Sequence, residues 1–290
     1  MKPIPESELI INSDGSIFHL HLKPEHIAKN IILVGDQGRV ATVSSFFDKI
    51  DIKIQNREFV THTGTYKGNP ISVISTGIGT DNIDIVVNEL DAIVNIDLKT
   101  RLIKDKHTKL NFIRIGTSGA LQEDIPVDSF LMSKMAVGFD GMLNYYADRE
   151  KVSNIDIEKK FIEFVNWNPN LAKPYFVNAS DKLISKLGKD IRKGITISAP
   201  GFYGPQGRVL RVPVADPELN NKISRFDYNG DKITNYEMES SAIFGLSAYL
   251  GHEAVTVCAI IANRLRKEYS KDYKPVIKDL IKTVLDRLFD

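Results

Sequence analysis

The sequence predicts an α/β protein built around a largely parallel, mostly buried β-sheet with helical crossovers. Short β-rich apolar runs alternate along the chain with longer amphipathic runs, which is the pattern of strand–helix–strand units. Most of the strand candidates are apolar on both faces, as a sheet covered by helices requires. The 290 residues contain no long linker, repeat or low-complexity tract, so we expect one domain over residues 1–290.

The expected strands are short runs rich in β-branched residues. They cover residues 31–34, 71–75, 111–115, 128–137, 194–199 and 253–262. Helices are expected over residues 81–97 and 236–250, and the C-terminal segment repeats apolar residues at helical spacing from Val276 to Leu288. The lysine-rich segment 98–110 is interpreted as a solvated helix face and not as a binding patch.

Composition excludes several classes of function. The formal net charge is +1, without a strongly basic block, so neither a nucleic acid nor an anionic membrane is an expected partner. The single cysteine, Cys258, lies in an apolar run and is expected to be buried in a strand, without a disulfide or a nucleophilic role. Since the first residues lack the basic start and apolar core of a secretory leader, and no run approaches the ~20 apolar residues of a membrane span, we expect a cytoplasmic protein.

Three expected strands end in loops of glycine and small polar residues, at 34–40, 75–82 and 114–120. Glycines let backbone N–H groups approach an anion, but one such loop alone indicates only a turn. The arginines strengthen the case: Arg39 follows the first loop and Arg114 directly precedes the third. Both guanidiniums are therefore expected at the carboxyl ends of the strands, where such sheets bind ligands.

The expected ligand of these arginines is a small anion such as phosphate. The loops lack the GxxxxGK[ST] spacing of nucleoside triphosphatases, and no GxGxxG is followed by a ribose-binding acid. The sequence therefore excludes these two nucleotide-binding motifs.

A second candidate region is the loop GFYGPQGR at 201–208. An aromatic ring can stack on a planar base, and Gln206 offers a donor and an acceptor in one plane, which matches a pyrimidine edge. A surface loop whose Phe202 and Tyr203 cap the core explains the composition equally well. Further on, NYEMESSA at 235–242 places Glu237 and Glu239 two residues apart, and one helical turn cannot point both the same way. We expect one to bind a vicinal diol and the other to serve as a structural cap or pair.

These motifs occur in an order that resembles the nucleoside phosphorylase superfamily and, within it, the uridine phosphorylases. The resemblance runs from about His19 to Arg264 and rests on FHLHL at 18–22, GDQGR at 35–39, NREF at 56–59, STGIG, RIGTSGA, FYGPQGR, YEMES and IANR at 261–264. It implies a three-layer α/β/α sandwich with a central mixed, mostly parallel sheet.

Two features resemble uridine phosphorylases more than their purine-specific relatives. The purine enzymes carry an aspartate after the strand that corresponds to 253–262, whereas this chain has Asn263 and Arg264. Gln206 and Arg208 match the glutamine and arginine of the uracil pocket. Both features point to uracil.

The resemblance also implies a role for each matching residue. Arg57 would enter the phosphate site from a neighbouring subunit, and His19 would cross the same interface to the ribose 5′-hydroxyl. Residue type alone predicts instead that His19 is a partly exposed histidine at a strand edge and that Arg57 forms a surface ion pair with Glu58. Arg114, Gln206, Arg208 and Glu239 would be catalytic. The implied phosphate site is Gly35, Arg39, Arg57, Arg114 and Thr117, and the implied nucleoside site is His19, Thr117, Phe202, Gln206, Arg208, Glu237, Met238, Glu239 and Arg264.

The implied partners are uridine, inorganic phosphate as co-substrate, and further copies of this chain in a homodimer or hexamer. The resemblance implies no cofactor. The monovalent cation that some bacterial members hold near the glutamate matching Glu58 is not expected here, because the loop carries Asn82 where a serine is usual, and no metal is expected. Three alternatives stay open: a broader pyrimidine phosphorylase that accepts thymidine or deoxyuridine, a nucleosidase that uses water, and a nucleoside-binding protein without turnover.

Overall fold

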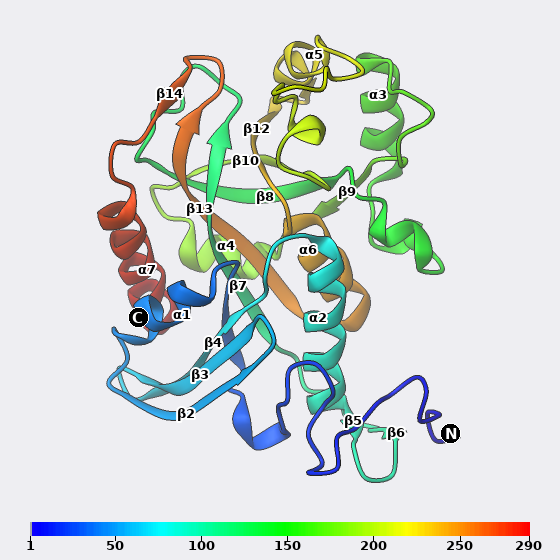
Figure 1. Cartoon of the computed structure of the whole chain (residues 1–290), viewed down its shortest axis with the longest axis vertical. Coiled ribbons are helices and arrows are strands. Elements are labelled where there is room, and N and C mark those ends of the chain that lie inside the picture. The colour runs from blue at the N-terminus through cyan, green and yellow to red at the C-terminus, as the bar shows by residue number, and fades with distance from the viewer. Residues whose placement is uncertain (1) are drawn as a thin grey trace.

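The computed structural model describes residues 2–290 and contains one large mixed sheet of twelve strands (Figure 1). Its order is β11–β12–β10–β8–β13–β7–β1–β4–β3–β2, while β9 pairs with β8 and β14 with β13. The strands are β1 (Asn30–Val34), β2 (Lys49–Asn56), β3 (Phe59–Tyr66), β4 (Asn69–Ser75), β7 (Asn111–Ala120), β8 (Phe130–Gly138), β9 (Tyr175–Asn178), β10 (Arg192–Ser198), β11 (Asp227–Tyr228), β12 (Asp231–Glu237), β13 (Glu253–Asn263) and β14 (Glu268–Tyr269).

The sheet curls back on itself. β1 runs parallel to β4 and β7, β7 parallel to β13, and β10 parallel to β8 and β12, whereas the other pairs in the sheet are antiparallel. Because β12 also pairs with β7, the five strands β7, β12, β10, β8 and β13 form a closed ring. This closure brings the end of β12 against the carboxyl end of β7, at Gly119 and Ala120, and so places Glu237 and Glu239 near Arg114.

Helices cover the sheet on both faces. In Figure 1, α1 and α7 lie on one side of the strands and α2 and α6 on the other, while α3 and α5 pack together at one end. The helices are α1 (Gln37–Ser44), α2 (Thr80–Asn95), α3 (Ile155–Val165), α4 (Asp181–Leu187), α5 (Leu219–Arg225), α6 (Ser240–Leu250) and α7 (Lys274–Phe289). Short 3-10 turns cover Pro24–His26, Met142–Tyr145, Arg149–Lys151 and Gly204–Gln206. The α/β architecture with a central mixed sheet confirms the fold class expected from the sequence.

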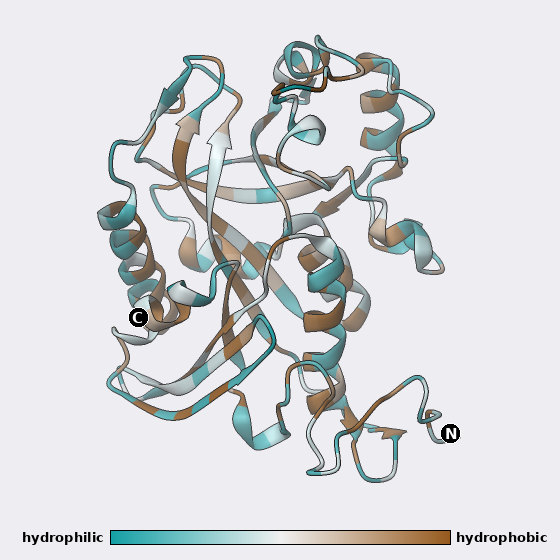
Figure 2. Cartoon of the chain, viewed as in Figure 1, coloured by the Kyte–Doolittle hydropathy of each residue, from teal (hydrophilic) through white to brown (hydrophobic). Residues whose placement is uncertain are grey.

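The hydrophobic interior follows this layering. The inner strands are largely apolar, and β2 shows alternating teal and brown bands (Figure 2). A separate aromatic cluster around Phe161 and Phe226 packs α3 and α5 onto the sheet. No helix among residues 2–290 is long and apolar enough to cross a bilayer.

Three expectations about individual elements are wrong. The expected helix at 236–250 begins only at Ser240, because residues up to Glu237 complete β12 by pairing with β10. The expected strand at 111–115 continues through the glycine loop to Ala120, because β13 pairs with it over its whole length. Segment 98–110 contains no helix but turns and the second strand of a hairpin, β5 (Ile96–Asp97) with β6 (Leu102–Ile103).

The antiparallel strands β2 and β3 were not among the expected elements. β2 has the sequence KIDIKIQN, whose strict alternation of polar and apolar residues is the signal of a half-exposed strand. The turn between them carries Arg57 at φ 53°, a left-handed conformation.

Candidate active site

A cavity of about 1040 Å³ opens where β1, β4, β7, β12 and β13 end or cross. It gathers residues from loops far apart in the sequence, as expected for the carboxyl ends of strands in an α/β sheet. Every site residue expected from the sequence lines it except His19 and Arg57: Gly35, Arg39, Arg114, Thr117, Phe202, Gln206, Arg208, Glu237, Met238, Glu239 and Arg264.

Arg39 reaches the cavity from the first turn of α1, whose N-terminus is capped by the Asp36 carboxylate through the Gly38 N–H at 3.0 Å. Its Nη1 donates to the carbonyl of Ile115 at 3.4 Å, and no carboxylate lies within ion-pair distance of it among residues 2–290. Burial, and next to it the charge of Arg114, lower the pKa of Arg39. The guanidinium keeps its charge at neutral pH, and an anion in the cavity would offset this unfavourable burial.

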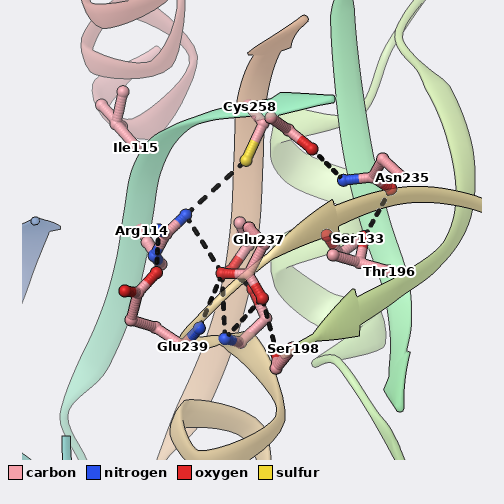
Figure 3. Close-up of polar contacts among 12 residues, drawn as sticks. Arg114, Ile115, Ser133, Thr196, Ser198, Asn235, Glu237, Glu239 and Cys258 are labelled. Atoms are coloured by element: carbon pink, nitrogen blue, oxygen red, sulfur yellow. Dashed lines mark hydrogen bonds and ion pairs between the residues drawn. The ribbon is translucent and has the colours of Figure 1, made fainter. Parts of the chain in front are cut away.

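Arg114 is only 6% exposed, and its side chain runs along its own strand toward Gly116. Residues two apart in a strand face the same side, and a Cβ on Gly116 would lie 2.0 Å from Arg114 Nη1, so the glycine makes room for the guanidinium. Arg114 Nη1 lies 3.3 Å from the Glu237 carboxylate, and Nη2 is hydrogen-bonded to Glu239 (Figure 3). Although burial disfavours its charge, these two carboxylates raise the pKa of Arg114.

The two glutamates have different surroundings but point toward the same arginine. Glu237 accepts from Ser198 Oγ at 2.6 Å and from the N–H groups of Glu239 and Ser240, so its carboxylate caps α6. Glu239 accepts from the Gly79 N–H at 2.9 Å as well as from Arg114. The expectation that they point apart is wrong, because the segment is a strand end followed by a helix cap and not a helical turn.

Burial raises the pKa of the Glu239 carboxyl, with nearby Glu237 adding to the rise and Arg114 opposing it. The two carboxylates of Glu237 and Glu239 neutralise the positive charge of the Arg114 guanidinium. Arg39 is therefore the arginine at this end of the cavity whose charge is not matched by a contacting carboxylate among residues 2–290.

At another part of the cavity, the 200–217 loop brings in an amide and a second arginine. Gln206 is 3% exposed, and its Oε1 accepts from Arg208 Nη1 at 2.5 Å. The Arg208 guanidinium lies 3.8 Å from the centre of the Phe202 ring. Phe202 and Tyr203 are about half exposed, at 51% and 53%. They therefore do not cap the core, and the interpretation of this loop as core packing is wrong.

Tyr236 and Arg264 complete this region. Tyr236, the residue before the end of β12, has a buried ring that lines the cavity, and the Arg264 guanidinium lies 5.6 Å from the ring centre. Arg264 Nη1 is buried and has no hydrogen-bond partner among residues 2–290. Burial lowers the pKa of both Arg208 and Arg264. This end is suited to an electron-rich ligand that accepts hydrogen bonds.

Asn263 borders the cavity but is occupied structurally. Its Nδ2 donates to the carbonyls of Gln122 at 2.9 Å and Ile125 at 2.7 Å, and its Oδ1 accepts from the N–H groups of Leu265 and Arg266. An aspartate at this position would face two carbonyl oxygens without a proton donor. The side chain therefore anchors the end of β13 and offers no acid to a ligand.

His19 and Arg57 lie together outside the chain's own cavity. His19 Nδ1 is 2.6 Å from the Glu89 carboxylate, and its carbonyl accepts from Asn56 Nδ2 at 2.8 Å. The exposed Arg57 guanidinium lies 5.7 Å from the centre of the Phe18 ring and forms no ion pair among residues 2–290, with Glu58 or otherwise. His19 is in a turn and not at a strand edge, so neither interpretation based on residue type alone is correct.

The cavity wall also contains residues that sequence reasoning did not select, including Gln37, Ile78, Tyr236, Lys267 and Tyr269. Tyr236 is the first residue of the quoted motif YEMES but was not selected from it; its signal was a lone aromatic residue beside paired glutamates. Burial raises the pKa of the Cys258 thiol to about 12, so it is not a nucleophile, as expected. Among residues 2–290 no cluster of His, Cys, Asp or Glu is arranged to hold a metal ion.

A mixed-sheet α/β fold with paired arginines and an amide–arginine–aromatic pocket in one cavity defines a nucleoside phosphorylase type of protein. The chain belongs to the phosphorylase superfamily, whose family model matches residues 29–286. It is 33% identical to a uridine phosphorylase of Thermococcus kodakarensis, covering 89% of this chain and 81% of the relative. It is 29% identical to a uridine phosphorylase of Escherichia coli, covering 88% and 89%.

The fold is also similar to a solved structure from Trypanosoma brucei, a nucleoside phosphorylase described as showing uridine phosphorylase activity. The TM-score is 0.88 at 30% sequence identity, and the match covers 97% of this chain and 99% of that chain.

Proposed function

We propose that this chain is a uridine phosphorylase, which converts uridine and inorganic phosphate reversibly into uracil and ribose 1-phosphate in cytoplasmic pyrimidine salvage. The observation that carries the proposal is the division of one cavity into an arginine-lined part around Arg39 and Arg114 and a base-recognising part around Gln206 and Arg208. The two curated relatives of that name support the same activity.

Phosphate occupies the first part. Arg39, whose burial lacks a contacting carboxylate, supplies the uncompensated charge, with Arg114, Thr117 and the Gly35 backbone around it. Glu239 and Met238 hold the ribose, with Glu239 accepting from its hydroxyls while Arg114 keeps the carboxylate in place. Phosphate then attacks C1′ from the face opposite to the base, with inversion.

The leaving uracil gains negative charge as the glycosidic bond breaks. Arg208 and Gln206 donate and accept hydrogen bonds at its oxygens and N3, and Phe202 and Tyr236 cover its faces. Such donors act chiefly in the transition state, and loss of one costs about 3 kcal/mol in comparable oxyanion sites. No ring nitrogen has to be protonated, which agrees with the structural use of Asn263. Because the arginines stay charged, pH dependence follows the ionisation of phosphate and substrate.

The site is shared between subunits. His19 and Arg57 line no part of their own chain's cavity, although they lie together and partly exposed. We infer that they complete the cavity of a second copy, with Arg57 at phosphate and His19 at the ribose 5′-hydroxyl. At least a homodimer is therefore required.

The test is release of uracil from uridine, followed by ultraviolet absorbance with and without phosphate, beside thymidine and inosine. Phosphate-dependent loss of uridine with inosine intact supports the proposal. Equal cleavage without phosphate means a nucleosidase, and an intact nucleoside in both conditions means a binding protein. Cleavage of thymidine at a similar rate means a broader pyrimidine phosphorylase.

A further inference from the structure

The base-recognising Gln206 lies in a segment with little regular structure. Between β10 and α5, the only regular element among the described residues is the short turn Gly204–Gln206, and Val209, Leu210 and Val212 are exposed. The Gln206 N–H bonds within the loop, to Tyr203 O at 3.0 Å. A buried specificity-determining amide on such a loop needs an external support.

Asn220 supplies that support. Its Nδ2 donates to the Gln206 carbonyl at 3.1 Å, which among residues 2–290 is the hydrogen bond that joins Gln206 to a residue outside 200–217. Its Oδ1 accepts from the Tyr236 hydroxyl at 2.9 Å. One side chain therefore connects the base-recognising loop to the buried ring at the end of β12.

Two observations show that the loop lies tightly against Asn220 and that Asn220 is itself anchored. Gly207 has φ +70°, and a Cβ on it would lie 2.4 Å from Asn220 Nδ2, so the loop approaches Asn220 more closely than another residue at 207 would allow. Asn220 itself sits on α5, which is fixed to the core by the fully buried Ile223 and by Gln122 Nε2 donating to Ser224 O at 2.9 Å. The support is therefore anchored to the core, whereas the loop it holds has little regular structure of its own.

The bridge uses both halves of the Asn220 amide. The Gln206 carbonyl can only accept, so Asn220 must donate to it through Nδ2, and the remaining amide oxygen, Oδ1, can then only accept from the Tyr236 hydroxyl. Tyr236 also lies beneath Arg264, so the same bridge aligns the amide of Gln206 with the second arginine of the base pocket.

We propose that Asn220 is a positioning residue: it holds Gln206 at a fixed place relative to Tyr236 and Arg264, and thereby determines how well the enzyme distinguishes uracil from other bases. The inference rests on the proposed uridine phosphorylase function. Asn220 touches no reacting atom; it acts through Gln206. A small displacement of a positioned group is costly to catalysis, so loss of the bridge affects turnover of the nucleoside more than affinity for phosphate.

The experiment compares steady-state kinetics of the full chain with those of Asn220→Ala and of Asn221→Ala. The Asn221 amide bonds only to exposed Glu218 among residues 2–290, so its removal is the matched control. We expect kcat/KM for uridine to fall about 10-fold in Asn220→Ala, with KM for phosphate within about twofold and Asn221→Ala near the parent. The preference for uridine over N3-methyluridine, which cannot donate to the Gln206 amide, should shrink as well.

A double-mutant cycle with Gln206→Ala separates positioning from general destabilisation. If Asn220 acts through Gln206, Asn220→Ala costs less than about twofold in the Gln206→Ala background. An equal loss in both backgrounds, or a loss of kcat alone that leaves the base preference unchanged, overturns the proposal.

Tyr236→Phe removes one hydroxyl and keeps the ring, so it tests the bridge if Asn220→Ala fails to fold. It should lower kcat/KM for uridine about fivefold and shrink the same preference; an unchanged kcat/KM overturns the proposal. A parent protein inactive on uridine refutes the proposed function instead, whereas an active parent with an unaffected Asn220→Ala refutes this inference alone.

Discussion

Arg39 and Arg114 line the same cavity but should differ sharply in what they contribute to stability. Arg114 contacts two buried carboxylates, whereas Arg39 contacts a carbonyl at 3.4 Å and no carboxylate among residues 2–290. Arg114→Ala leaves Glu237 and Glu239 buried and unpaired, and breaking a buried pair in this way costs about 3–5 kcal/mol of unfolding free energy. In Arg39→Ala, lost packing of the stem is offset by removal of a poorly compensated buried charge, so the change should stay within about 1 kcal/mol.

Phosphate should reveal the cost of losing Arg39. A ligand at about 100 times its Kd stabilises the protein that binds it by about 2.7 kcal/mol. The parent protein should show this gain with phosphate, and Arg39→Ala should lose most of it while remaining nearly as stable as the parent without phosphate. Arg39 would then be a residue that serves the ligand at no benefit to the fold.

The assay is urea unfolding at fixed protein concentration, with and without phosphate. The chain has a single tryptophan, Trp167, which packs against Phe139 and Phe161, so its fluorescence reports loss of this core. The Arg114→Ala deficit should also grow from pH 5 to pH 8. Unpaired buried carboxyls have raised pKa values, so the folded state keeps protons that the unfolded state has lost, and its stability falls as pH rises. An Arg39→Ala variant as unstable as Arg114→Ala, or as well protected by phosphate as the parent, would refute this reasoning.

Two further predictions concern assembly and a buried acid. Mixed oligomers of Arg57→Ala and Arg114→Ala chains should regain activity. Random dimers should reach about a quarter of the parent activity, because one of the two sites in each mixed dimer has both arginines intact. Activity no higher than that of either variant alone would mean that Arg57 does not act across subunits. Burial raises the pKa of Asp140, whose carboxylate accepts from Tyr175 Oη at 2.7 Å and Ser241 Oγ at 2.9 Å. The folded state therefore keeps the Asp140 proton at pH values where the unfolded state has released it, which begins near the ordinary aspartate pKa of 3.8. The free energy of unfolding measured in urea should decline from about pH 4 upward in the parent, and should decline less in Asp140→Asn. Parallel pH profiles of the two proteins would contradict this.

Much of the fold was readable because its signals are local. The apolar runs at 31–34, 71–75 and 253–262 lie in strands, and the repeat from Val276 to Leu288 lies in α7. The segments that were misjudged depend on a distant partner. Glycines at 116 and 119 suggested a loop, but pairing with β13 holds residues up to Ala120 in a strand.

The sequence by itself determined most of the polar side chains that line the cavity, because the ordered motifs that carry its arginines, Gln206 and glutamates can be recognised without a structure. Only the tertiary structure decided how they are used. Curling of the sheet brings β12 against β7, so both glutamates meet Arg114 while Arg39 stays without a carboxylate partner among residues 2–290, and it sets Asn220 between Gln206 and Tyr236. The physical reason is that charge pairing, burial and hydrogen bonding depend on distances of a few ångströms between segments far apart in the chain, and spacing along the sequence carries no record of those distances.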